Sequence, residues 1–448
     1  MGDRMLFYWC SDSEFICTSS LQILSDELKK NGYHCKLNKT AAYNLLTFSF
    51  MQDNETPIAN VFRINPGCYI EFDGKRLTER SYHIFSNLKT VERTEEEYID
   101  LIDKKFRIAV RRQMEKDEEY GYEHLASLSS GLDARMTVRV ATDMGYPVHT
   151  ITFSQSQFID ETIAERLAEK MRTSHMYMAL DDGRCMYNLE KVVKLGYGMT
   201  AANHTMHSLN MMEKLNLKRF GMLHTGQVGG AILASFETNK IHSEVSPMAK
   251  PYSLMLAEKN IDENYKKYSN YEMQVLYTRT FRGSLGNQMT HYHYIEMFSP
   301  FCDVDFFEFC LSIPLKYRTN HNIYRKWIIS KYPDVANIVW GTTGKPITHT
   351  ETKVTEFAKK SKGKILRVLK GSKPTFLNKN IMTPYDYWFA NYGDIQEHYN
   401  HLFKQLINLV EDKELNEDIC YLFEYGVARE KMQVLTLLLC ICNLHINC

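Results

Sequence analysis

The sequence predicts an α/β protein with a parallel, doubly wound sheet and a helical C-terminal part, preceded by a small β-rich segment. Three observations support this prediction: β-type runs alternate with helical runs from Glu123, a glycine-containing turn follows the first run, and helical patterning dominates after about Ser253. Alternation of this kind implies parallel strands joined by helices that cover both faces of the sheet. Ligands bind such sheets at the carboxyl ends of the strands.

The alternating region gives the positions of the individual elements. Strands are expected over His124–Ser129, Val148–Ser154, His175–Leu180 and Phe220–Thr225. Helices are expected over Asp133–Met144, over Glu161–Arg172 with Asp160 as its N-cap, over Tyr271–Thr280, Val304–Ser312 and Tyr324–Lys331, and from about residue 383 to the end. Gly145 and Pro147 are typical of the chain just after a helix, which is where the first of these helices should end.

The first part of the chain differs in pattern. Short β-type runs occur at Leu46–Phe50 and at Cys68–Phe72, and the second follows the turn-forming sequence Asn65-Pro66-Gly67. Charge then rises, and Arg93–Met114 has helical spacing of its apolar residues. We therefore expect two domains, a β-rich one over residues 1–92 and a larger one over residues 93–448.

Composition narrows the class of partner. The 448 residues include 54 basic and 54 acidic side chains, so nothing favours nucleic acid or an anionic membrane as the main partner. The 11 cysteines are irregularly spaced and include no CxxC pair, which predicts buried free thiols, with disulfides or a zinc site as the alternatives. No apolar run approaches the length of a membrane span. We expect a cytoplasmic protein.

The turn after the first expected strand has the residue types of an anion site. It reads Ser129-Ser130-Gly131-Leu132-Asp133-Ala134-Arg135. N–H groups at a helix start favour anions, serine hydroxyls add donors, and Gly131 lets the backbone approach a phosphate. Asp133 could hold Mg²⁺ that bridges to phosphates. The alternative is a simple strand–helix turn with serine caps. GxxxxGK[ST] does not occur, and no βα turn carries GxGxxG.

This turn resembles the SGGLDS pyrophosphate loop of the asparagine synthetase and β-lactam synthetase family. Other family motifs follow in the same order. Thr152-Phe153-Ser154 resembles one of them, and Thr225–Gly230 lies where the family has an SGxGGDE-like loop. Tyr294–Glu296 and Ser299–Asp303 together resemble the ExRxPFLD segment of the family, and Lys345 falls near its late lysine. The resemblance covers about residues 123–346. It implies a PP-loop nucleotide-binding domain, with the first domain similar to a truncated glutaminase domain.

The resemblance also implies a reaction and a set of roles. The family adenylates a carboxylate with ATP and Mg²⁺ and then transfers an amine to it. Nucleotide-binding roles fall on Leu128, Ser129, Ser130, Gly131, Leu132, Asp133, Thr152, Phe153, Ser154 and Gly226, and the metal role falls on Asp133. Glu296 would deprotonate or orient the amine, Lys345 would stabilise developing charge, and Gln227 would contact the intermediate. The alternatives are a salt bridge from Glu296 to a core-facing arginine, and a Lys345 that is a solvated loop lysine.

Three departures from the family pattern matter. Gly2 stands where the glutamine-hydrolysing members carry a nucleophilic cysteine, so ammonia or an amine should come from outside, for example from a separate glutaminase. Gly230 stands where the family has its second metal-binding aspartate, and Glu237 is the nearest replacement. Ala134 replaces the last serine of the loop, which removes one donor worth about 0.5–1.5 kcal/mol.

Three hypotheses on function remain. The first is an ATP-dependent amide-forming ligase that acts on a small-molecule or peptide carboxylate, including ring closure within one substrate. The second is a catalytically impaired relative that binds nucleotide as an interaction protein. The third is thiolation, for which Cys185 and Cys302 are the nearest candidate nucleophiles.

The substrate pocket and a histidine pair complete the predictions. The pocket should be formed by Met199–Asn210 and by residues after Gln288. His291 and His293 lie two positions apart, so they should point to different faces rather than form a metal site.

Overall fold

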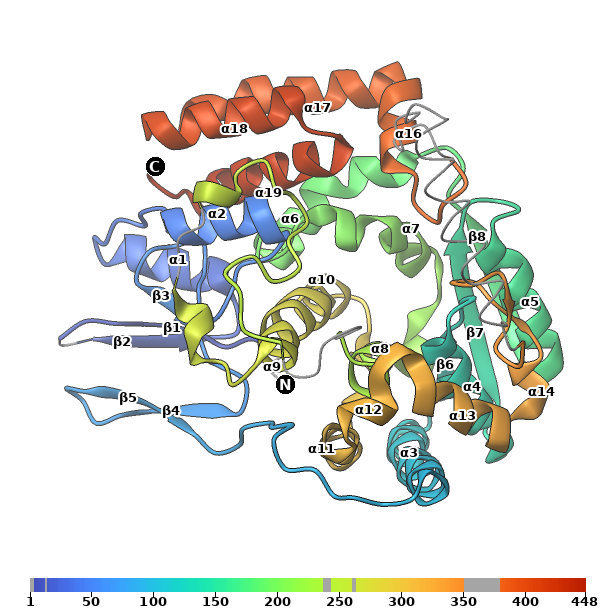
Figure 1. The fold of residues 1–448 in the computed structure, drawn as a ribbon. Coiled ribbons are helices and arrows are strands. Elements are labelled where there is room, and N and C mark those ends of the chain that lie inside the picture. The colour runs from blue at the N-terminus through green and yellow to red at the C-terminus, as the bar shows by residue number, and fades with distance from the viewer. Residues whose placement is uncertain (1–3, 13, 237–242, 260–262, 350–378) are drawn as a thin grey trace.

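A five-stranded parallel sheet lies on the side of the protein away from the N-terminal strands, at the right of Figure 1, where β6, β7 and β8 are labelled. The computed structural model describes residues 4–12, 14–236, 243–259, 263–349 and 379–448. The strand order is β10-β9-β6-β7-β8, with bounds β6 Glu123–Ser127, β7 Val148–Ser154, β8 Ser174–Ala179, β9 Phe220–His224 and β10 Glu296–Phe298. The four expected strands are therefore confirmed to within one or two residues at each end.

The order of the strands reverses direction at one place. From β6 the chain proceeds through β7 to β8, and it then returns so that β9 pairs with the opposite side of β6. The pairs Leu125–Leu223 and Ala126–His224 fix the register of β6 against β9. The loops that follow β6 and β9 therefore meet at the carboxyl ends of these two strands, where a doubly wound sheet has its ligand-binding crevice.

Helices cover both faces of the sheet. On one face lie α3 (Glu95–Glu119), α4 (Leu132–Asp143) and α5 (Ile159–Met171), whose apolar side chains form one core with Ala126 and Val148. On the other face, α7 (Met206–Lys214) packs Met211 and Met212 against Leu125, Ile151 and Leu223. Adjacent residues of one strand thus belong to different cores, as expected from the alternation of side chains along a strand.

One predicted helix cap is wrong. Asp160 is the second residue of α5, and Phe158 occupies the N-cap position. The Asp160 carboxylate instead accepts a hydrogen bond of 2.8 Å from the backbone N–H of Ser130. An aspartate that precedes a helical run is a common N-cap, but here the neighbouring turn supplies the donor. The cap prediction failed because that donor comes from a residue thirty positions earlier.

Further short helices connect and flank the sheet. They are α6 Leu189–Gly196, α8 Gly229–Leu233, α9 Tyr271–Val275, a π-helix over Leu276–Leu285, α10 Gln288–His291, α11 Val304–Ser312, α12 Leu315–Arg318, α13 Asn322–Lys331 and α14 Pro333–Ala336. A two-stranded sheet of β11 (Val339–Trp340) and β12 (Lys345–Pro346) follows. The helix predicted over Val304–Ser312 is confirmed, and the one predicted over Tyr271–Thr280 continues as the π-helix.

The N-terminal part contains the expected short strands and also two helices. Its bounds are β1 Phe7–Cys10, β2 Phe15–Thr18, α1 Leu21–Lys30, α2 Lys39–Phe48, β3 Val61–Arg63, β4 Cys68–Phe72 and β5 Leu77–Ser81. The strand predicted at Cys68–Phe72 is confirmed. The one predicted at Leu46–Phe50 is wrong, because most of it belongs to α2, which Asn38 caps and whose last eight residues are all buried. Full burial explains the error, since a short apolar run does not distinguish a buried helix from a strand.

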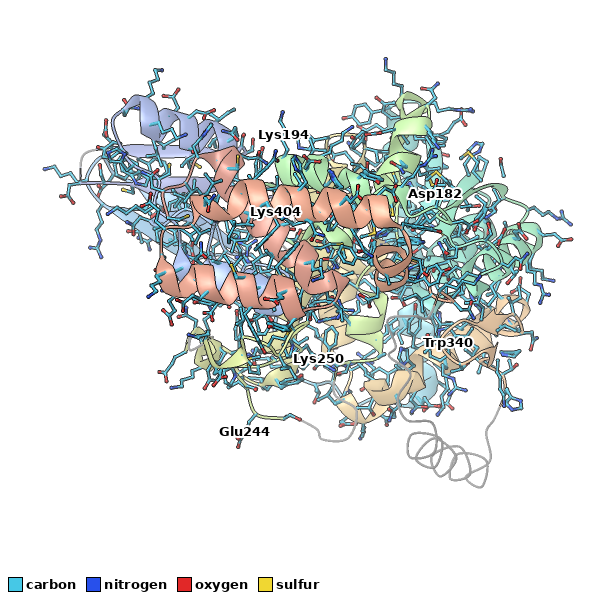
Figure 2. All side chains as sticks on the ribbon, turned by 90° about the horizontal axis from the view of Figure 1, so that it is seen from above. Asp182, Lys194, Glu244, Lys250, Trp340 and Lys404 are labelled. Carbon is cyan, nitrogen blue, oxygen red and sulfur yellow. The ribbon has the colours of Figure 1, made fainter. Side chains whose placement is uncertain are left out.

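Four C-terminal helices share a core with the N-terminal part (Figures 1 and 2). They are α16 Tyr385–Asn391, α17 Gly393–Leu406, α18 Lys413–Tyr425 and α19 Ala428–Leu444. The hydroxyl of Ser25 in α1 donates to the carbonyl of Leu444, and the side chain of Gln433 in α19 donates to the hydroxyl of Ser49. The two ends of the chain therefore stabilise each other, and the division at residue 92 stays a prediction.

Two further expectations concern thiols and membranes. All 11 cysteines are free, as predicted, but only some are buried. Cys440 and Cys442 both belong to α19, and Cys440 is buried whereas Cys442 is exposed. Among the described residues, no helix combines the length and the apolar character that a membrane crossing requires.

Candidate functional site

A cavity of about 430 Å³ lies at the carboxyl ends of β6 and β9, where the strand order reverses. Residues from both following loops line it, and so do residues from β7, α7, α10 and the segment after α14. The volume falls within the range of about 300–1,000 Å³ that is typical of small-molecule sites. The position matches the crevice in which doubly wound sheets bind ligands.

The turn after β6 forms one wall of the cavity. Of the residues predicted to bind nucleotide, Ser129, Gly131, Leu132 and Asp133 line it. Helix α4 begins at Leu132 without a side-chain cap. Its first N–H groups therefore remain available for an anion in the cavity, where the helix dipole also favours negative charge.

Asp133 is the acidic side chain of this wall. Its Oδ2 accepts a hydrogen bond of 2.9 Å from the Gly230 N–H, and its Oδ1 accepts one of 2.9 Å from the hydroxyl of Tyr324. Burial raises the pKa of Asp133 to about 6, against the lowering effect of these two donors. The carboxyl is thus held in one orientation toward the cavity and becomes largely ionised near neutral pH.

The loop after β9 crosses directly over the start of α4. A Cβ atom on Gly226 would lie 2.1 Å from the backbone nitrogen of Ala134, and one on Gly229 would lie 2.7 Å from Cγ of Asp133. Gly226 is therefore required by the close approach of two backbones, and Gly229 by the close approach of the loop to the Asp133 carboxyl group. At Gly230 the nearest atom to such a Cβ would be Asp133 Oδ2, at an ordinary contact distance of 3.6 Å. A side chain at position 230 would thus find space beside Asp133.

Gln227 and Gly226 line the cavity, as the sequence comparison with the family led us to expect. The side-chain oxygen of Gln227 accepts a hydrogen bond from the amide of Gln288, and its backbone carbonyl accepts one of 2.7 Å from Ser299. These bonds fix Gln227 from the side of β10. The uncharged side-chain amide of Gln227 therefore lies at the cavity wall.

The other residues predicted to bind nucleotide divide into two groups. Phe153 lines the cavity together with Met212, Leu223 and Met297, which form an apolar wall. Leu128, Thr152 and Ser154 do not line it; all three are buried, and the hydroxyl of Thr152 donates a hydrogen bond of 2.6 Å to the Leu128 carbonyl.

Ser130 is likewise buried outside the lining, where it anchors the turn to the segment after α14. Its carbonyl accepts hydrogen bonds from the Gly341 N–H and from Arg135. Arg135 also donates to the carbonyls of Val335, Ile338 and Val339. Burial lowers the pKa of Arg135 to about 10, so the guanidinium stays charged at neutral pH. Trp340, which is labelled in Figure 2, follows this anchored segment and lines the cavity.

The structure does not bring Glu296 or Lys345 into the lining of this cavity. Glu296 forms an ion pair with Arg4 and lines a second cavity of about 660 Å³, which lies toward the amino ends of β9 and β10. The alternative prediction was a salt bridge to a core-facing arginine; the salt bridge is present, but Arg4 is exposed. Lys345 pairs with Trp340 in the β11–β12 sheet, and its ammonium lies 3.2 Å from His349. Glu237 is outside the described residues.

Four histidine side chains form another wall of the cavity, and the family motifs did not identify them. His204, His207, His291 and His321 line the cavity. Burial lowers the pKa of His207 and of His291 to about 4, so both are uncharged at neutral pH. The Nε2 atom of His291 lies 2.7 Å from the Ser208 hydroxyl, and the ring of His207 lies 5.3 Å from that of Phe153.

These positions agree with the two segments predicted to form the substrate pocket, Met199–Asn210 and the residues after Gln288. His293 lines the second cavity instead of the first, so the prediction that His291 and His293 face different ways is confirmed. Tyr324 and Trp340 were missed altogether, because neither belongs to a local motif and only the folded chain brings them to the turn.

Comparison with known proteins gives a family assignment. The asparagine synthase family model matches residues 101–240 and 234–332, which together make up more than half of the chain. The chain belongs to the asparagine synthase family. The matched region contains β6, β9 and both loops of the cavity.

Other comparisons add little. The NMN synthetase from Francisella tularensis is similar at 13% identity over 33% of this chain, with a TM-score of 0.22, which supports no conclusion about this protein. The match covers 60% of that synthetase. No curated protein matches the chain.

The donor set of the cavity is compatible with Mg²⁺. Mg²⁺ prefers oxygen ligands and is commonly held by one or two carboxylates together with substrate phosphates and water. Asp133 supplies one fixed carboxylate, and Gly230 leaves the second position to water or to the substrate. Because both oxygens of Asp133 already accept a hydrogen bond, metal binding would use their remaining lone pairs.

Alanine substitutions should distinguish Gly226 from Gly230 by their effect on stability. We expect Gly226→Ala to destabilise the protein by about 1–3 kcal/mol, because the new Cβ forces the loop away from α4. The matched variant Gly230→Ala should change stability little, since its Cβ meets an ordinary contact. Urea denaturation of both variants measures this difference. Equal stability of the two variants would contradict the close packing described here.

The titration of Asp133 should appear in the stability of the metal-free protein. A carboxyl whose pKa is raised to about 6 stays protonated longer in the folded state, so folding loses free energy as pH rises from about 4 to about 6. Relative to Asp133→Asn, the wild type should therefore lose up to about 3 kcal/mol over this interval and no more above pH 7. Denaturation with a chelator present, repeated across this pH range, gives the difference. A constant difference between the two proteins would show that burial does not disfavour the charge.

Proposed function

We propose that this protein is an ATP-dependent ligase that adenylates a carboxylate, with release of pyrophosphate, and then transfers ammonia or an amine to form an amide, with release of AMP. Membership of the asparagine synthase family supports this reaction class. The observation that carries the proposal is the cavity at the reversal of strand order, which Ser129, Gly131 and Asp133 line on one side and Phe153 lines on another.

The residues of the cavity fit the parts of such a substrate. The apolar wall of Phe153, Met212 and Met297 suits a purine ring. The uncapped start of α4 suits the negative charge of the diphosphate, which grows on the leaving group as the carboxylate oxygen attacks the α-phosphorus. Mg²⁺ would neutralise part of that charge when bound by Asp133.

The acyl half of the reaction would take place beside the imidazoles. His207 and His291 reach the cavity from α7 and α10, next to Phe153 and Ser208. As uncharged groups they can accept or donate hydrogen bonds to the carboxylate substrate without adding charge. The catalytic roles of Glu296, Lys345 and Gln227 stay predictions, and so does a source of ammonia or amine outside this chain.

A second candidate function is nucleotide binding without catalysis. Two observations favour it: Gly230 supplies an N–H where the family has a carboxylate, and Glu296 is engaged by Arg4 in the other cavity. Both candidates predict nucleotide binding, so binding alone does not distinguish them. Exchange of pyrophosphate into ATP does.

The test is Mg²⁺-dependent exchange of labelled pyrophosphate into ATP with a panel of small-molecule and peptide carboxylates. We expect exchange that depends on one class of carboxylate and falls about 100-fold or more in Asp133→Ala. Asp143→Ala is the matched control, because Asp143 ends the same helix and pairs with Arg107 and Arg139 outside the cavity.

Each outcome separates the candidates. ATP binding without exchange for any carboxylate would favour the non-catalytic function. Exchange that survives in Asp133→Ala would place the reaction elsewhere in the protein.

A further inference from the structure

Three buried side chains meet between α3 and the sheet, outside both cavities. Asp117 comes from the last turns of α3, His124 from β6 and His224 from β9. Their exposed fractions are 1%, 3% and 0%, and one ligating atom of each lies within 4.8 Å of the other two. Histidines and a carboxylate from three separate elements are thus brought to one point in the protein interior.

Both imidazoles turn one nitrogen inward, to the same carboxylate oxygen. Nδ1 of His124 lies 3.1 Å from Asp117 Oδ2, and Nε2 of His224 lies 2.7 Å from it. One carboxylate oxygen and two imidazole nitrogens, all of them atoms that ligate metals, therefore converge on one point.

The outer nitrogens also face acceptor oxygens. Nδ1 of His224 lies 3.2 Å from Gln113 Oε1, and Nε2 of His124 lies 3.8 Å from Glu118 Oε1. A neutral imidazole has only one N–H, so it cannot donate to an oxygen on both sides. A ring that donates its N–H to the outer oxygen turns an unprotonated nitrogen, the form that binds a metal, to the inner side.

The second oxygen of Asp117 is also unsatisfied. Oδ1 is buried and has no hydrogen-bond partner among the described residues. It lies so close to the backbone that a Cβ on Gly221 would approach it to 2.2 Å. A buried carboxylate oxygen without a donor is costly, and coordination to a cation is one way to satisfy it.

We propose that Asp117, His124 and His224 bind one divalent transition-metal ion of the zinc type, at a structural site separate from the nucleotide cavity. Two imidazoles and a carboxylate are a donor set that Zn²⁺ accepts, and Asp117 Oδ1 offers a fourth position. Gln113 and Glu118 would then orient the rings from outside, as acceptors behind metal-bound histidines commonly do.

The site needs only a small adjustment to hold the ion. Donor atoms about 2.0–2.1 Å from a tetrahedral zinc are roughly 3.3 Å apart. The observed separations of 3.1 and 2.7 Å would have to open by about 0.2 and 0.6 Å, respectively. Because His224 immediately precedes the loop of Thr225–Gly230, the ion would fix the point from which that loop leaves the sheet.

The test uses the full chain and Zn²⁺ and Co²⁺ as probes. We expect about one equivalent of zinc by mass spectrometry of the purified protein. After the protein is unfolded in chelator and refolded with Co²⁺, it should show the visible absorption of tetrahedral cobalt without a thiolate charge-transfer band. His124→Gln and His224→Gln should lower the metal content to below roughly a tenth of an equivalent.

His149→Gln is the matched control, because His149 lies on the neighbouring strand beside the carboxylate of Glu123 and should leave the metal content unchanged. The cobalt spectrum is recorded on the wild type, so it stands even if a variant does not fold. A folded wild type that takes up no Zn²⁺ or Co²⁺ would overturn the proposal. Metal that persists in the His124→Gln, His224→Gln double variant, bound for example by an exposed cysteine, would overturn it as well.

Discussion

Asp133 is held between a backbone N–H from the β9 loop and a hydroxyl from α13, and the geometry of the cavity depends on these two hydrogen bonds. They join three segments that are far apart in the sequence. The close contact of Gly226 with the start of α4 belongs to the same arrangement. If the loop moved away, the carboxylate would lose one donor and the start of α4 would lose the backbone that now covers it.

The same arrangement shows how this protein differs from the family pattern. The Gly230 N–H donates to Asp133 at a position where the family has a second acidic side chain. The site therefore has one fixed carboxylate, with pKa raised to about 6, instead of two. This difference should make metal binding more dependent on pH and on the phosphates of the substrate. A glycine at 230 is thus compatible with a nucleotide site, although it changes the balance of charge there.

Much of this could be predicted from the sequence where local pattern decides the structure. Val148–Ser154 and Val304–Ser312 have the predicted bounds, and Ser129, Gly131 and Asp133 lie at the carboxyl edge of the sheet as the turn motif indicated. These successes share one physical cause: strand and helix periodicity and the start of a helix are properties of consecutive residues.

The failures have the opposite cause. Leu46–Phe50 is largely helical because the surrounding core buries α2 on all sides, and Asp160 bonds to Ser130 because the fold brings the two together. The placement of Glu296 beside Arg4 and the meeting of Asp117, His124 and His224 also depend on tertiary contacts. No spacing in the sequence encodes such contacts, so motifs alone could not place these residues.

A crystal structure of the protein with ATP and Mg²⁺ tests the central claim most directly. The account predicts that the diphosphate lies against Ser129 and Gly131 at the start of α4, with the metal about 2.0–2.1 Å from a carboxylate oxygen of Asp133. A nucleotide bound outside this cavity, or a metal coordinated without Asp133, would contradict it.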